Sequence, residues 1–115
     1  FSVLQGTYKC FLPSLSIGFS GTVSGISCVY PEPFVKLYQC YNEGDYGKAK
    51  ECQSIAAQYC NALRNGSNMA YFKSGLAFRG LKKSFMRRPQ LDLTKSEEEA
   101  LFEQLKILDS KYKEL

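Results

Sequence analysis

The chain of 115 residues is 44% hydrophobic and 23% charged, with a formal net charge of +4. That length suits one small domain with a core of its own, and the composition is that of a soluble globular protein. No stretch approaches the ~18 unbroken apolar residues of a membrane helix, and no basic-then-apolar leader is visible where the chain begins. We therefore expect a cytoplasmic protein that does not contact a membrane.

The cysteines argue against both a metal centre and disulfides. No two have the spacing of a zinc knuckle, and the chain has no His. Cys52 and Cys60 lie about 12 Å apart along a helical pattern, which is too far for a disulfide. We expect reduced cysteines, packed as small hydrophobic residues of a cytosolic protein, with no metal and no cofactor. The cysteines are Cys10, Cys28, Cys40, Cys52 and Cys60.

Charge is distributed unevenly along the chain. From Cys52 to Leu91 there is no Asp or Glu, whereas the tail from Asp92 to Leu115 is rich in acids. Such asymmetry can mark a nucleic-acid patch. Here the basic residues are spread through helical patterns and one loop, so we expect a solvated face or pairing between subunits, and no nucleic-acid partner. The basic residues in question are Arg64, Lys73, Arg79, Lys82, Lys83, Arg87 and Arg88.

The first thirty residues predict one strand–helix–strand unit. A β-rich run over residues 1–5 ends at Gly6, a helix over 8–17 closes at Gly18, and a second run covers 22–26. Such a unit implies two parallel strands joined by a right-handed crossover. Two short parallel strands expose unpaired backbone groups on both edges and are not a stable sheet by themselves. We therefore expect the sheet to be completed elsewhere, as in a fragment of a larger fold.

From Pro31 onward the pattern predicts helices. The expected helices cover 34–41, ending at Gly44; 45–63, capped by Asp45 and stopped by Asn65-Gly66; roughly 68–78; and 94–112, begun by the capping-box spacing of Thr94-Lys-Ser-Glu97. Residues 80–93 are expected to be irregular. The apolar stripes along these helices indicate a packed core.

A series of motifs, in their order and spacing, resembles one family of enzymes. The motifs are Gly6, Gly-Thr-Val-Ser-Gly-Ile-Ser at 21–27, Val-Tyr-Pro-Glu-Pro-Phe-Val-Lys-Leu-Tyr at 29–38, Glu-Gly-Asp-Tyr-Gly-Lys-Ala-Lys-Glu-Cys-Gln at 43–53, Phe-Arg-Gly-Leu at 78–81 and Arg-Arg-Pro-Gln-Leu-Asp-Leu at 87–93. Essentially the whole chain is similar to the C-terminal part of the N-acetylneuraminate lyase and dihydrodipicolinate synthase family. This family comprises pyruvate-dependent aldolases and includes keto-deoxy-gluconate aldolase.

The resemblance implies an α/β fold: the C-terminal fragment of a (β/α)8 TIM barrel, with strands seven and eight, followed by a C-terminal helical extension. Residues 1–43 would form the last two β/α units and residues 44–115 the helical domain. In the family, a lysine on strand six forms a Schiff base with pyruvate or a related 2-oxo acid, and a tyrosine on strand five moves protons. Neither strand would lie in this chain, so we expect no catalytic residue in it and no activity of the chain alone. The resemblance also implies a homo-oligomer, specifically a homotetramer.

Active sites of such barrels lie at the carboxyl ends of the strands. By the family pattern, the backbone carbonyl of Gly6 lies near the substrate, Val23 lies against the methyl side of pyruvate, and residues 7–9 contact the rest of the substrate. The family usually has an acidic residue where this chain has Tyr8 and an Asn where it has Cys28. The expected substrate-binding residues are Gly6, Thr7, Tyr8, Val23 and Ser24.

Two further interpretations of the sequence stay open. Lys9 follows a strand end and could itself form a Schiff base if it were desolvated, although a solvated lysine at the barrel mouth is the simpler interpretation. The chain could also be a non-catalytic helical assembly module, or a remnant of such a barrel, and the changes at Tyr8 and Cys28 favour that alternative.

Overall fold

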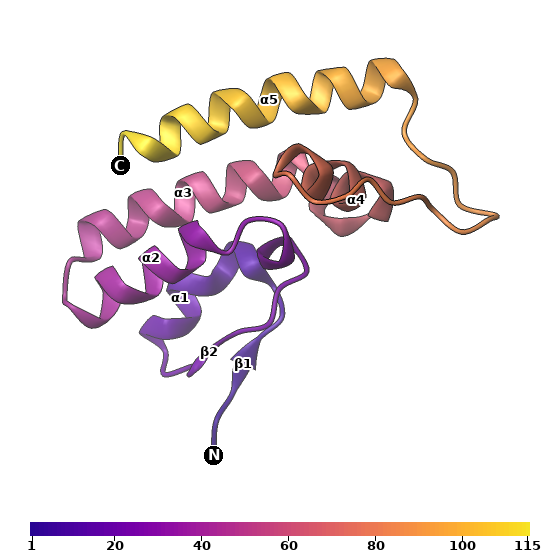
Figure 1. Ribbon diagram of the computed structural model, residues 1–115. Helices are drawn as coiled ribbons and strands as arrows, with labels where there is room; N and C mark the ends of the chain where they lie inside the picture. Colours follow the sequence, from indigo (N-terminus) through magenta and orange to yellow (C-terminus); the bar gives the residue numbers. More distant parts are fainter.

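The computed structural model describes all 115 residues (Figure 1). The elements follow in the order β1 (Leu4–Gln5), η1 (Tyr8–Cys10), α1 (Phe11–Ser16), β2 (Gly21–Thr22), η2 (Ile26–Cys28), α2 (Glu32–Asn42), α3 (Tyr46–Ala62), η3 (Arg64–Gly66), α4 (Met69–Phe78) and α5 (Lys95–Lys113), where η marks a turn of 3-10 helix. None of the helices has the length and apolar character that a membrane span requires.

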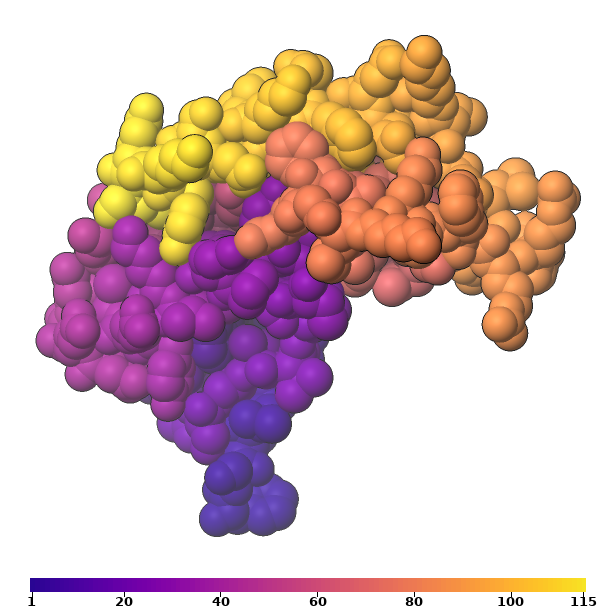
Figure 2. Space-filling model, in the orientation of Figure 1, coloured from indigo at the N-terminus to yellow at the C-terminus, as the bar shows by residue number.

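The two strands form a parallel pair, as the sequence predicts. Leu4 lies opposite Gly21 and Gln5 lies opposite Thr22. Both strands have only two residues, so the predicted extents of 1–5 and 22–26 were too long. The sheet is therefore a short ribbon at one end of the molecule, beside the N-terminus, which protrudes from the body (Figures 1 and 2).

The second strand ends early because its serines form local hydrogen bonds. The Ser24 hydroxyl accepts from the Ser27 backbone N–H at 3.3 Å, and the Ser27 hydroxyl donates to the Ser24 carbonyl at 2.7 Å. These bonds compete with sheet pairing and turn the chain into η2. Ile26 is consequently buried in the core from a 3-10 turn and not from a strand.

The helices build the core. α2 and α3 lie side by side, and α5 crosses over α3 and α4 (Figure 1). The stripe predicted on α3 is entirely buried; it consists of Ala49, Cys52, Ile55, Ala56, Tyr59, Ala62 and Leu63. On α2 the stripe is only partly buried, because Tyr38 is exposed and stacks on Phe11 of α1, with ring centroids 6.3 Å apart.

Side-chain caps begin α3 and α5 where the sequence predicts them. Asp45 accepts a hydrogen bond from the Lys48 backbone N–H at 3.0 Å. The capping box of α5 is complete: Thr94 accepts from the Glu97 N–H at 3.3 Å, and the Glu97 carboxylate accepts from the Thr94 N–H at 2.8 Å. Each cap satisfies backbone donors that the helix itself leaves free.

All five cysteines are free thiols, but only three are packed in the core. Cys40, Cys52 and Cys60 are buried, and burial raises the pKa of the Cys60 thiol to about 12. Cys10 and Cys28 are exposed, so the prediction of buried cysteines was wrong for these two. Both lie on short 3-10 turns at the surface, which offer no continuous apolar face.

The segment between α4 and α5 is irregular, as predicted, and reaches away from the body as an overhanging loop (Figures 1 and 2). The Lys73 ammonium donates to the Phe85 carbonyl at 2.6 Å and ties the loop back to α4. The loop exposes the large apolar side chains of Leu81, Phe85 and Leu91.

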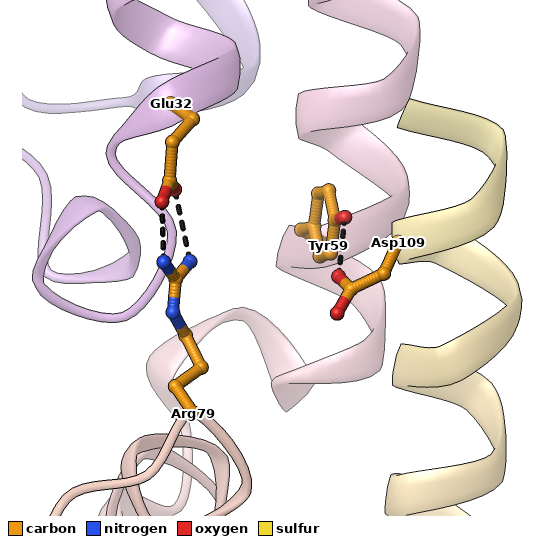
Figure 3. A network of polar contacts seen from close by, with 4 residues as sticks. All are labelled: Glu32, Tyr59, Arg79 and Asp109. Carbon is orange, nitrogen blue, oxygen red and sulfur yellow. Dashed lines mark hydrogen bonds and ion pairs between the residues drawn. The ribbon is translucent and has the colours of Figure 1, made fainter. Parts of the chain in front are cut away.

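A cluster of polar and aromatic side chains connects α2, α3, α4 and α5. Its members are Tyr30, Glu32, Tyr59, Arg79 and Asp109. Arg79 follows α4, and its two terminal guanidinium nitrogens, Nη1 and Nη2, donate to the two carboxylate oxygens of Glu32; the Tyr59 hydroxyl donates to Asp109 at 2.8 Å (Figure 3). The Arg79 guanidinium lies 4.6 Å from the ring centroid of Tyr30, which stacks on Tyr59 at 4.0 Å. The Tyr30 hydroxyl is buried and makes no hydrogen bond.

Acid should weaken this fold through two carboxylates. The hydrogen bond from Arg79 lowers the pKa of Glu32, and the bonds with Thr94 lower the pKa of Glu97. A carboxylate whose pKa is lower in the folded state stabilises the fold above its unfolded pKa, and that stability is lost as the pH falls through the folded pKa. We expect the urea midpoint to fall as the pH is lowered below about 4.5, the ordinary pKa of a Glu carboxyl, and to fall less in Glu32→Gln. Glu103→Gln, at an exposed ion pair, is the matched control; an equal effect of both substitutions would contradict the prediction.

Candidate active site

Three of the predicted substrate-binding residues lie together in one cavity. This cavity of about 330 Å³ is at the carboxyl end of β1 and is lined by Gly6, Thr7, Tyr8, Lys9 and Asn65. The first four residues are consecutive, whereas Asn65 comes from η3, beyond the end of α3. The cavity therefore lies between the strand ends and the C-terminal helices.

Gln5, the last residue of β1, makes four hydrogen bonds that fix the end of this strand beside the cavity. Its backbone carbonyl accepts from the Val23 N–H at 3.0 Å and from the Thr22 hydroxyl at 2.6 Å. Its side-chain oxygen accepts from the Thr7 N–H at 2.9 Å, and its side-chain nitrogen donates to the Ser14 hydroxyl at 2.8 Å. The turn at Gly6 is thereby fixed against both strands and against α1.

The residues after Gly6 are tied to α3 and to the turn that follows it. The Tyr8 hydroxyl donates to the Asn65 carbonyl at 2.6 Å, and the Lys9 ammonium donates to the Asn61 side-chain oxygen at 2.6 Å. Gln53 donates to the Tyr8 carbonyl at 3.3 Å. Burial, together with the nearby Cys60 thiol, raises the pKa of Tyr8, so its hydroxyl stays protonated as a donor.

Asn65 is the lining residue that sequence reasoning missed. Arg64 and Asn65 have φ values of 56° and 53°, and Gly66 has 75°, so three consecutive residues adopt a left-handed conformation. That conformation is strained for Arg64 and turns Asn65 toward the strand ends. The sequence showed Asn65-Gly66 only as a helix stop. The preference of Asn for left-handed backbone was the available signal, but it says nothing about which cavity the residue faces.

Val23 and Ser24 do not line this cavity. Val23 is 66% exposed and lies immediately after β2. Ser24 is buried, and its hydroxyl is engaged by the Ser27 N–H. The structure thus brings Gly6, Thr7 and Tyr8 together and leaves the other two predicted residues outside. The roles of all five in substrate binding stay predictions.

The charged residues in the segments around the cavity are all basic. The two segments that form it, residues 6–10 and 61–68, contain Lys9 and Arg64 and no acidic residue. The Arg64 guanidinium lies 5.2 Å from the ring centroid of Tyr71, so it is directed to α4. Lys9 is therefore the charged group at the cavity wall, where it can offer hydrogen bonds to an anion.

A wider groove runs along the other side of β2. It has a volume of about 730 Å³ and lies between β2, η2, α1 and α2. Its lining combines polar residues of β2 and α2 with the aromatic side chains of Phe11, Phe34 and Tyr38. Val35, one of its lining residues, and Val23, immediately after β2, are both exposed.

A parallel strand pair with a cavity at its carboxyl end is the arrangement found in α/β barrels. The family comparison agrees. Residues 1–108 match the model of the dihydrodipicolinate synthetase family, and the chain belongs to that family.

Relatives of known name agree with this assignment. The chain is 32% identical over 109 residues to 4-hydroxy-tetrahydrodipicolinate synthase of Methanosphaerula palustris, covering 95% of this chain and 38% of that protein. Its fold matches a variant of the Sulfolobus solfataricus 2-keto-3-deoxygluconate aldolase with a TM-score of 0.86 at 21% identity, over 96% of this chain and 38% of that one. YagE of E. coli K12, solved in complex with pyruvate, matches with a TM-score of 0.84 at 22% identity, over 95% and 37%.

The chain is much shorter than these relatives. It spans 38% of the length of the Methanosphaerula palustris relative and 32% of that of an uncharacterized DapA-like lyase of Halobacterium salinarum. The structural matches place the chain within the α/β-barrel fold of those proteins. Most of its residues in regular structure are helical.

Proposed function

We propose that this chain supplies strands seven and eight and the helical extension of a Schiff-base 2-oxo-acid aldolase. This aldolase would be of the keto-deoxy-sugar-acid aldolase type or of the dihydrodipicolinate synthase type. The lysine that attacks the 2-oxo acid would lie on a preceding strand, outside this chain. The observation that carries the proposal is the cavity at the carboxyl end of β1, which the resemblance assigns to substrate.

The contribution of this chain to the chemistry would be to bind and orient. The backbone carbonyl of Gly6 would face the substrate, and Val23 would contact the methyl side of pyruvate once neighbouring strands surround it. In a Schiff-base aldolase the imine accepts electrons from the bond that breaks, so the substrate must be held with that bond in line. The hydrogen bonds of Gln5 would supply this rigidity, because they fix the turn at Gly6.

The uncovered sheet supports the proposal that further strands, outside this chain, complete it. Parallel sheets are normally covered on both faces and paired at both edges. Here a pair of two-residue strands has uncovered edges, and Val3, Leu4 and Val23 are exposed beside them. We further propose the division into barrel units at 1–43 and a helical domain at 44–115, a homotetrameric assembly, and a cytoplasmic location.

Borohydride trapping with pyruvate tests the function. The chain is joined behind the preceding strands of the Methanosphaerula palustris relative, in place of the segment that it matches. We expect the joined protein to form a reduced pyruvate adduct on a lysine of the preceding strands, detected by intact mass and peptide mapping. The isolated chain should form none.

Two outcomes would overturn this assignment. An adduct on Lys9 of the isolated chain would place the nucleophile in this segment. A folded joined protein without an adduct, beside an unmodified relative that forms one, would favour the non-catalytic assembly module. Circular dichroism and size-exclusion chromatography of the joined protein establish that it is folded before trapping.

A further inference from the structure

The residues that line the cavity beside β1 favour one chemical class of ligand. Its lining combines one cation, Lys9, with the polar residues Thr7, Tyr8 and Asn65 and the backbone at Gly6. No acidic residue lies in either segment that forms the cavity. An uncompensated cation in a concave polar site attracts anions.

Lys9 is held in place but not neutralised. Its ammonium donates to the uncharged side-chain oxygen of Asn61 at 2.6 Å and forms no ion pair. An ammonium carries three N–H donors, so two stay free for a ligand. Because Asn61 is on α3, the position of the charge is set by a helix and not by a mobile side chain alone.

Asn65, which also lines the cavity, offers a second side-chain donor. Its backbone carbonyl is occupied by the Tyr8 hydroxyl, whereas its carboxamide makes no hydrogen bond within the chain. Asn65 lines the cavity from a stretch of left-handed backbone that includes Arg64. Strained backbone that is retained beside a cavity is typical of a ligand site.

We propose that Lys9 and Asn65 form a subsite for an anionic group, a carboxylate or phosphate at the end of a short hydroxylated ligand. The proposal rests on the proposed function only in assigning this anion to the distal end of the aldol substrate. The substrate would then carry negative charge at both ends, with the 2-oxo acid carboxylate at the end that reacts. Charge-assisted hydrogen bonds from the ammonium supply most of the affinity, and the carboxamide supplies direction.

Three probes with the same carbon skeleton test the subsite on the chain itself: glycerol, D-glycerate and glycerol 3-phosphate. In a two-dimensional NMR titration we expect saturable shifts at the amides of residues 6–9 and at the Asn65 carboxamide with the two anions, and none with glycerol. The relative size of the response to glycerate and to the phosphate tells which anion the site takes. Raising the salt concentration should weaken binding, because the attraction is between charges.

Substitutions distinguish anion binding at this subsite from non-specific attraction of anions to a basic surface. Lys9→Met should weaken binding of the preferred anion by about tenfold or more, and Asn65→Ala by about threefold. Lys9→Arg should retain binding, and it guards against the case in which Lys9→Met disturbs the fold. Lys48→Met, at a lysine of the first turn of α3, is the matched control and should change nothing.

Several results would overturn the proposal. They are equal shifts with glycerol, no saturable shift with any probe, or shifts that persist unchanged in both Lys9→Met and Asn65→Ala. These measurements do not involve pyruvate or an adduct, so failure here leaves the trapping experiment to decide the proposed function separately.

Discussion

Replacing Leu105 with alanine should lower the free energy of unfolding by about 3 kcal/mol. Leu105 is 0% exposed, in the middle of α5, and belongs to the core that α5 forms with α3 and α4. Removing its side chain loses the transfer free energy of the buried carbons and leaves a cavity that rigid neighbouring helices fill only in part. Urea unfolding followed by circular dichroism measures the change.

The matched control lies two residues further along the same helix. Ile107 is 57% exposed, so Ile107→Ala should change the free energy of unfolding by less than about 0.5 kcal/mol. A similar loss in both variants would mean that α5 does not dock through the face seen in the structure.

Two helical glycines should respond to substitution with opposite signs. A Cβ on Gly75 of α4 would lie 3.1 Å from Val29 Cγ1 and 3.2 Å from Leu63 Cδ2, and both neighbours are buried. Gly75→Leu should therefore destabilise the fold by about 3 kcal/mol through overpacking. Gly47 of α3 meets only an Asp45 side-chain oxygen, at 3.7 Å, so Gly47→Ala should stabilise the fold by about 0.5 kcal/mol.

Thermal and urea unfolding of the two glycine variants, side by side with the wild type, decide this prediction. A stabilising Gly75→Leu would show that α4 is free to move away from the segment holding Val29. A destabilising Gly47→Ala would show that the first turn of α3 needs conformational freedom that alanine lacks.

The helices were predictable because their signals are local. Asp45, Thr94 and Glu97 cap their helices through bonds that span three residues, so the sequence pattern contains the complete motif. The extent of the strands was not predictable to the same degree. A strand is defined by its partner, and the local bonds between Ser24 and Ser27 ended β2 sooner than its composition indicated.

The candidate site was partly predictable, through the resemblance to a family. Gly6, Thr7 and Tyr8 were identified from their place after a strand, and the structure does bring them together in one cavity. Asn65 was not identified, because its contact with Tyr8 joins residues 57 positions apart. The ion pair between Glu32 and Arg79 spans 47 positions and was equally invisible, since no periodic pattern reports such a pairing.

Several hydrogen bonds hold η1 and the start of α1 against residues that are synthesised much later, which affects the order of folding during synthesis. Gln53 accepts the N–H of Leu12, and Asn61 and Asn65 accept from Lys9 and Tyr8, so the partners follow by 41 to 57 positions in the chain. At about 5–20 residues per second, the ribosome adds these partners roughly 2 to 11 seconds after the segment that contacts them. We therefore expect the first β/α unit to gain these contacts only after α3 and the turn that follows it have been synthesised.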